Sequence, residues 1–157
     1  MNIQINGDYR QDAVAQAVDV EALARAVLAH EHLPEETEVS ITFVDDDEMH
    51  RLNKEYRGID RPTDVLSFEC DGMPEPDDLP LPEGEVWALG DVIIAPDVAE
   101  RQTADYGTSF TDELSLLLVH GLLHLCGYDH IEDDEAEEME GLERQILSAF
   151  YGRPFQR

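Results

Sequence analysis

Three histidines in the run HGLLHLCGYDH have the residue type and the spacing that bind a catalytic metal ion. His120 and His124 are four residues apart, about one helical turn, so both imidazoles lie on one face of a helix. Gly127 can adopt the left-handed conformation that ends a helix, which lets the chain turn back with His130. Three neutral imidazoles with a fourth position open to water form the ligand set of a catalytic zinc ion. The sequence therefore predicts one zinc ion per chain at His120, His124 and His130.

The pattern HxxxHxxGxxH also occurs in zinc peptidases, but one residue of their motif is different here. In those enzymes a glutamate follows the first histidine and acts as the general base. In this chain the position is Gly121, which cannot accept a proton. Peptide hydrolysis by that route is disfavoured, whereas other hydrolysis is not, because zinc lowers the pKa of a bound water to about 7. A metallopeptidase-like hydrolase is an alternative, as is a core helix with two structural histidines.

Length and composition predict a single domain over residues 1–157. The chain is 42% hydrophobic, which is enough for a packed core. No run of about eighteen apolar residues could span a membrane, and the N-terminus has no secretory signal pattern. The two cysteines, Cys70 and Cys126, form no disulfide framework. We therefore expect a cytoplasmic protein with no membrane partner.

The net charge of −27 is extreme, yet the few cations are clustered. A chain this acidic is generally expected to repel nucleic acid. Arg51, Lys54, Arg57 and Arg61 nevertheless lie within eleven residues of one another. The cluster is either a local contact for a polyanion or a solvated helix face that offsets the acids at 45–48. Composition leaves both interpretations open.

Hydrophobic periodicity and turn residues predict the elements that position these side chains. Strands are expected at 2–6, 38–44, 64–69 and 88–94. Helices are expected at 12–30, 45–56, 96–106, from Ser109 or Thr111 through His124, and at 133–151. Residues 70–86 contain four prolines and are expected to form a long loop. The order predicts an α+β fold: a small mixed four-stranded sheet packed with about five helices, and the zinc site on the central helix and the following turn.

Two groups of side chains carry more specific expectations. In the helix at 45–56, Asp45 is expected to cap the N-terminus with Glu48 as capping-box partner, and Met49, Leu52 and Tyr56 are expected to point inward. Asp129, Asp91 and Asp64 are candidates for orienting the imidazole rings, or for local hydrogen bonds only. Cys126 lies about 200° around the helix from His124 and is expected to be buried away from the metal.

At this point three blocks of sequence resemble a known family. HGLLHLCGYDH followed by IEDDEAEEME is similar to the signature of the YbeY family, which are bacterial metal-dependent endoribonucleases that mature ribosomal RNA. YRGIDRPTDVLSF at 56–68 and LGDVII at 89–94 match two further blocks, so the resemblance covers nearly the whole chain. The cysteine at position 126 is a departure, because the family more usually has an aliphatic residue there.

The resemblance implies a function that the spacing alone does not. It implies a single-strand-specific, zinc-dependent endoribonuclease that acts in 16S rRNA 3′-end maturation and ribosome quality control. A small-subunit ribosomal protein and a ribosome-assembly GTPase are the implied partners, besides ribosomal RNA. A non-catalytic ribosome-assembly factor, in which zinc only braces the fold, is the alternative.

Arg57 is the family arginine tied to RNA cleavage, and the resemblance therefore implies a catalytic role for it. Its planar guanidinium would offset the negative charge that grows on the scissile phosphate. The competing interpretation is a surface ion pair with Glu55 or Asp60. Three cations beside it, Arg51, Lys54 and Arg61, are the candidate substrate-binding residues.

Overall fold

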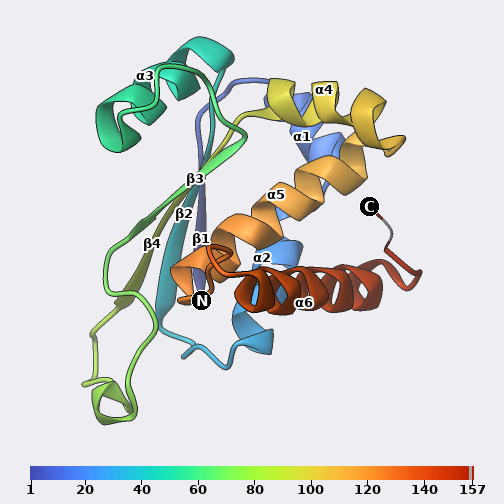
Figure 1. Ribbon diagram of the computed structural model, residues 1–157. Helices are drawn as coiled ribbons and strands as arrows, with labels where there is room; N and C mark the ends of the chain where they lie inside the picture. The colour runs from blue at the N-terminus through green and yellow to red at the C-terminus, as the bar shows by residue number, and fades with distance from the viewer. Residues whose placement is uncertain (156) are drawn as a thin grey trace.

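The computed structural model describes residues 1–155 and 157, and it is built on a mixed four-stranded sheet (Figure 1). The strands are β1 (Asn2–Asn6), β2 (Thr37–Phe43), β3 (Val65–Glu69) and β4 (Trp87–Ile94). They lie in the order β1-β2-β4-β3. The first three are parallel, and β3 pairs antiparallel with β4 at one edge. The predicted α+β fold with a small mixed sheet is confirmed.

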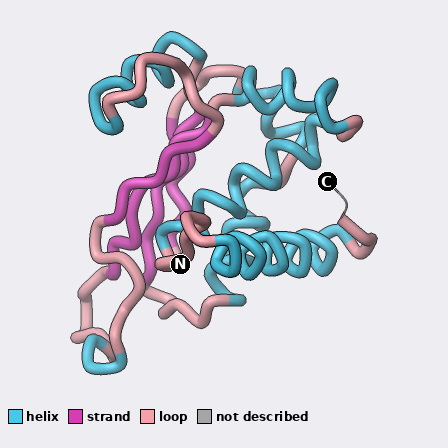
Figure 2. Tube along the Cα trace, viewed as in Figure 1, coloured by secondary structure: helices cyan, strands magenta, loops and turns pink. Residues whose placement is uncertain are grey.

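Six α-helices pack against this sheet or against one another. They are α1 (Gln11–Ala17), α2 (Val20–His30), α3 (Asp46–Arg57), α4 (Pro96–Tyr106), α5 (Phe110–Leu125) and α6 (Asp133–Tyr151). Helix α5 is central, because it contacts α2, α4 and α6 as well as β3 and β4. Figure 2 shows that all helices except α3 lie on one side of the strands. This layer buries the main core, and α3 covers a smaller apolar cluster that includes Met49, Leu52 and Leu66.

One predicted helix is in fact two. The periodicity over 12–30 is continuous, but the chain is extended at Val18, with φ −143° and ψ 134°. Asp19 then caps α2, because its carboxylate accepts a hydrogen bond from the backbone N–H of Ala22 at 3.1 Å. Aspartate favours such caps over helix interiors, and it therefore restarts the helix in a new direction.

Helix α3 and its Asp45 cap match the prediction, whereas the predicted roles of Glu48 and Tyr56 do not. Asp45 accepts a hydrogen bond from the backbone N–H of Glu48 at 2.8 Å, whereas the Glu48 carboxylate pairs with Arg51 instead of closing a capping box. The prediction that Tyr56 points inward is wrong, because Tyr56 is 60% exposed. Its ring packs edge-on against Phe68 of β3. Since β3 is the edge strand, the sheet does not extend beyond Phe68 to cover this ring.

Helix α5 packs unusually close to the sheet at Gly121. A Cβ atom there would lie 2.6 Å from Val92 Cγ1 and 3.0 Å from Val65 Cγ2, so only glycine fits. Ser67 on β3 donates a hydrogen bond to the Gly121 carbonyl oxygen at 2.8 Å. Position 121 therefore faces the sheet. The residue type that zinc peptidases use as a base has no room here.

The segment 70–86 is the long loop that its prolines predicted. It contains one short 3₁₀ turn, Pro76–Asp78, and it extends away from the helical layer in Figure 1. Within the described residues, no helix is both long enough and apolar enough to cross a membrane.

Candidate metal centre

The three predicted histidines converge at one point at the edge of the sheet. His120 and His124 project from the last turns of α5, and His130 lies on the exposed segment that follows Gly127. One ring nitrogen from each lies within 4.8 Å of the other two. Ring centroids are 4.6 Å apart for His120 and His124, and 5.2 Å and 5.1 Å from these two to His130.

Hydrogen bonds to Nδ1 fix the protonation of two of these rings. His124 Nδ1 lies 2.9 Å from the backbone carbonyl oxygen of Tyr128. A carbonyl only accepts, so Nδ1 carries a proton, and in the neutral ring Nε2 then has a free lone pair. His120 Nδ1 lies 2.9 Å from the buried carboxylate of Glu143 on α6. Donation from Nδ1 to this carboxylate leaves Nε2 as the atom through which His120 can bind a metal ion.

The Nε2 atoms of these two rings face each other, which fits a bound cation. The Nε2 atoms of His120 and His124 are 3.0 Å apart. Two lone pairs aimed at each other repel, whereas a metal ion bound by both converts the repulsion into coordination. Burial and the neighbouring His120 also lower the pKa of His124, which favours the neutral imidazole that a metal needs. The three histidines can therefore hold a metal ion.

Replacing Glu143 by glutamine is expected to weaken metal binding. Glutamine keeps the size of the side chain but removes the charge that holds His120 Nδ1–H and raises the basicity of Nε2. We expect a loss of about 10- to 100-fold in metal affinity, measured by competition with a chromophoric chelator. Glu137→Gln, at an exposed position of the same helix, is the matched control. Equal affinities for the two variants would contradict this role of Glu143.

A groove of about 730 Å³ opens over the histidines, and we call it the histidine groove. It is lined by Val65 and Ser67 of β3 and by Arg57 from the end of α3, as well as by the three histidines. The histidine groove therefore contains one guanidinium together with the three imidazoles.

Arg57 has no ion pair with any described residue. The two acids expected to pair with it are engaged elsewhere: Glu55 binds Arg51 at 2.8 Å, and Asp60 lies 2.6 Å from His50. The Asp60 carboxylate also lies 4.0 Å from Lys54. Arg57 is therefore exposed and available to a ligand.

The other three clustered cations are placed differently. Arg51 is held by Glu48 and Glu55, Lys54 lies near Asp60, and none of Arg51, Lys54 and Arg61 lines the histidine groove. Their role in substrate binding stays a prediction. They would act on parts of an RNA strand that extend outside the groove.

The residue that orients His120 was missed from the sequence. Asp129 accepts the backbone N–H of His130, and Asp64 accepts that of Val65. Within the described chain, neither of these nor Asp91 is hydrogen-bonded to an imidazole. The carboxylate that is hydrogen-bonded to His120 belongs to Glu143, which lies 23 residues from His120 in the sequence. The available signal was a glutamate on the inward face of α6, between the buried residues Met139 and Ile146.

Cys126 is buried next to the centre but outside the metal cluster, as expected. Burial in apolar surroundings raises the pKa of its thiol to about 12. The thiolate form that binds metals is therefore inaccessible at neutral pH.

Comparison with known proteins identifies the family. The family model described as "Endoribonuclease YbeY" matches residues 4–151. The chain belongs to the endoribonuclease YbeY family. It is 42% identical to the endoribonuclease YbeY of Agathobacter rectalis, an alignment that covers 94% of this chain and 92% of the relative. It is 38% identical to that of Exiguobacterium sp., with 96% of both chains covered.

A solved structure of similar fold supports the same conclusion. The solution structure of TM1509 from Thermotoga maritima matches with a TM-score of 0.64 and 29% identity, covering 96% of this chain and 89% of that one. The predicted YbeY family and the predicted endoribonuclease class are thereby confirmed.

Proposed function

We propose that this YbeY-family protein is a single-strand-specific, zinc-dependent endoribonuclease that acts in 16S rRNA 3′-end maturation and ribosome quality control. His120, His124 and His130 hold one zinc ion, and Arg57 is the catalytic arginine. The observation that carries this proposal is the pair of Nε2 atoms 3.0 Å apart, from two histidines that line a groove together with an unpaired guanidinium. This arrangement combines a cation site with an anion-binding group at one point.

The residues of the chain have separate tasks in cleavage. A bound zinc ion supplies Lewis acidity, which polarises a phosphoryl oxygen and lowers the pKa of water. Glu143 and the Tyr128 carbonyl keep the imidazoles of His120 and His124 in the ligating tautomer. Arg57 donates two parallel hydrogen bonds to the non-bridging oxygens as their negative charge increases.

The acidity of the surface supports a protein partner. With a net charge of −27, the chain has weak long-range attraction for RNA but strong attraction for a basic ribosomal protein. Docking on a small-subunit ribosomal protein and a ribosome-assembly GTPase would hold the enzyme next to the rRNA that it cleaves. These partners belong to the cytoplasm, where we place the protein.

Cleavage of matched single-stranded and duplex RNA tests the proposal. We expect zinc-loaded protein to cut the single strand at least about tenfold faster than the duplex, to lose activity on chelation and to regain it with zinc. Casein in a parallel assay should stay intact, since Gly121 provides no base. Zinc-loaded protein that cuts neither RNA would instead support an assembly factor with a bracing metal.

A further inference from the structure

Most cations of this chain are neutralised by neighbouring acids. Seven of the ten Lys and Arg side chains form ion pairs: Arg10, Arg25, Arg51, Lys54, Arg101, Arg153 and Arg157. Among the described residues, Arg57, Arg61 and Arg144 have no such partner. Because the chain has 37 acids and ten cations, a cation left without a carboxylate is unusual here and is a candidate contact for an external anion.

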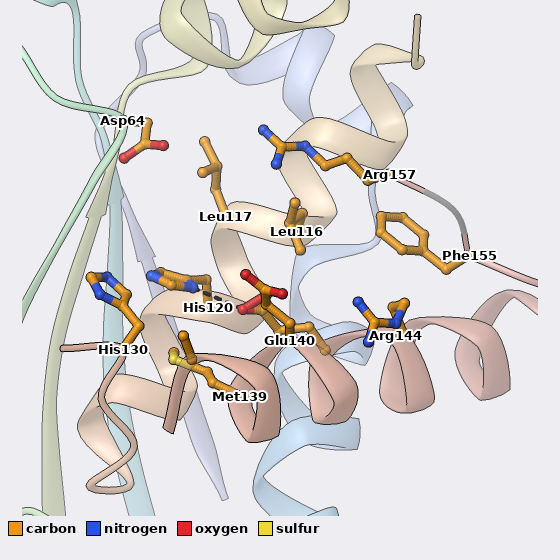
Figure 3. A pocket seen from close by; sticks show the side chains of 12 residues that line it. Asp64, Leu116, Leu117, His120, His130, Met139, Glu140, Arg144, Phe155 and Arg157 are labelled. Atoms are coloured by element: carbon orange, nitrogen blue, oxygen red, sulfur yellow. Dashed lines mark hydrogen bonds and ion pairs between the residues drawn. The ribbon is translucent and has the colours of Figure 1, made fainter. Parts of the chain in front are cut away.

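Arg144 lies at a second cavity beside the metal ligands, which we call the α6 cavity. It has a volume of about 280 Å³ and lies between α5, α6 and the C-terminal residues. It shares Asp64, His120 and His130 with the histidine groove. Figure 3 shows the imidazoles of His120 and His130 at one end of this cavity and Arg144 at the other. The two unpaired arginines Arg57 and Arg144 therefore line cavities that meet at the histidines.

The walls of the α6 cavity suit a nucleotide. Its apolar lining comes from separate elements: Leu116 and Leu117 on α5, Met139 on α6, and Phe155 near the C-terminus. Glu140, one turn before Arg144 on α6, supplies a carboxylate that can accept hydrogen bonds from base amino groups. An apolar surface beside polar acceptors and a guanidinium is how proteins hold an unstacked base and its phosphate.

Arg157 lines the same cavity but is not available in the same way. Its guanidinium binds both oxygens of the buried Glu113 at 3.0 Å and lies over the ring of Tyr106. Removing it would leave a buried carboxylate unpaired, at a structural cost. Arg144 pairs with no described carboxylate, so its guanidinium is available to bind a ligand.

We propose that the α6 cavity is a nucleotide subsite for single-stranded RNA, in which Arg144 binds a backbone phosphate and the apolar side chains of the lining contact an unstacked base. This inference rests on the proposed function. The strand would cross the histidines with one phosphate at Arg57 and another, on the opposite side of the cleaved bond, at Arg144. The chain thus holds its substrate on both sides of the metal.

Steady-state kinetics on a single-stranded oligonucleotide test this subsite. We expect Arg144→Gln to raise KM about 5- to 10-fold and to leave kcat within about twofold, since Arg144 contacts substrate away from the reacting atoms. The dependence of log affinity on log salt should fall by about 0.7, one phosphate contact on a single strand. Arg25→Gln, an exposed residue on α2 that lines neither cavity, changes the net charge equally and should leave KM unchanged.

Shortened substrates locate the contact. When nucleotides are removed one at a time from either end, the KM ratio between wild type and Arg144→Gln should fall to one at a single step on one end only. Equal KM values for Arg144→Gln and Arg25→Gln would overturn the subsite. If the wild-type protein cleaves no RNA, the proposed function is overturned instead. The subsite is then tested by fluorescence anisotropy of a labelled strand on metal-free protein, again comparing Arg144→Gln with Arg25→Gln.

Discussion

Replacing His124 by alanine is expected to abolish metal binding and to reduce RNA cleavage at least about 1000-fold. His124 is the ligand whose Nε2 faces that of His120 at 3.0 Å, with its tautomer fixed by the Tyr128 carbonyl. Without it, only two imidazoles remain, and one of them lies on an exposed segment. Metal content by mass spectrometry and cleavage of a single-stranded RNA, measured on one preparation, check the result.

The control is a histidine outside the cluster. His32 is exposed and has a left-handed backbone with φ 59°, which asparagine tolerates. His32→Asn should therefore keep full metal content and activity. Metal-free wild type and His124→Ala should unfold at similar temperatures, which separates metal loss from misfolding. A His124→Ala protein that retains stoichiometric metal would refute the ligand set.

Replacing Arg57 by lysine is expected to lower kcat by about 100- to 1000-fold. Lysine keeps the positive charge but lacks the planar fork that donates two hydrogen bonds to a phosphate. Arg57 makes no ion pair with the described residues and lies at the end of α3. Thermal stability and metal content should therefore not change. Single-turnover cleavage with saturating protein measures the chemical step.

Arg51→Lys, in the same helix, provides the comparison. Arg51 is tied to Glu48 and Glu55 and lies outside the histidine groove, so this variant should keep a kcat near that of wild type. If Arg57→Lys cleaves as fast as Arg51→Lys, Arg57 has no catalytic role. A rise in KM without a change in kcat would make Arg57 a binding residue only.

The sequence predicted the metal cluster because its ligands are local. His120 and His124 share one helix, and the turn at Gly127 returns the chain so that His130, six residues after His124, reaches them. The strands were predicted within one residue, since β2 alternates strictly between buried and half-buried positions. Family resemblance added Arg57, which no spacing rule connects to the histidines.

What the sequence did not predict depends on tertiary contacts. Glu143 reaches His120 only because α6 packs on α5, and no local pattern encodes that pairing. Val18 continues the apolar pattern of one helix, yet Asp19 caps the N-terminus of α2 and so separates α2 from α1. Tyr56 follows the stripe of Met49 and Leu52 but lies beyond the edge of the sheet. The steric need for Gly121 became evident only with Val92 and Val65 in place.

The ligands of the metal centre differ in how firmly the protein holds them. His120 and His124 are anchored on α5, whose buried residues are locked against the sheet, whereas His130 belongs to an exposed stretch after Gly127. Ordering that stretch costs conformational entropy. This cost reduces the free energy that coordination by His130 adds to metal binding. A metal ion bound by all three histidines would therefore link the exposed segment after Gly127 to the rigid helix α5.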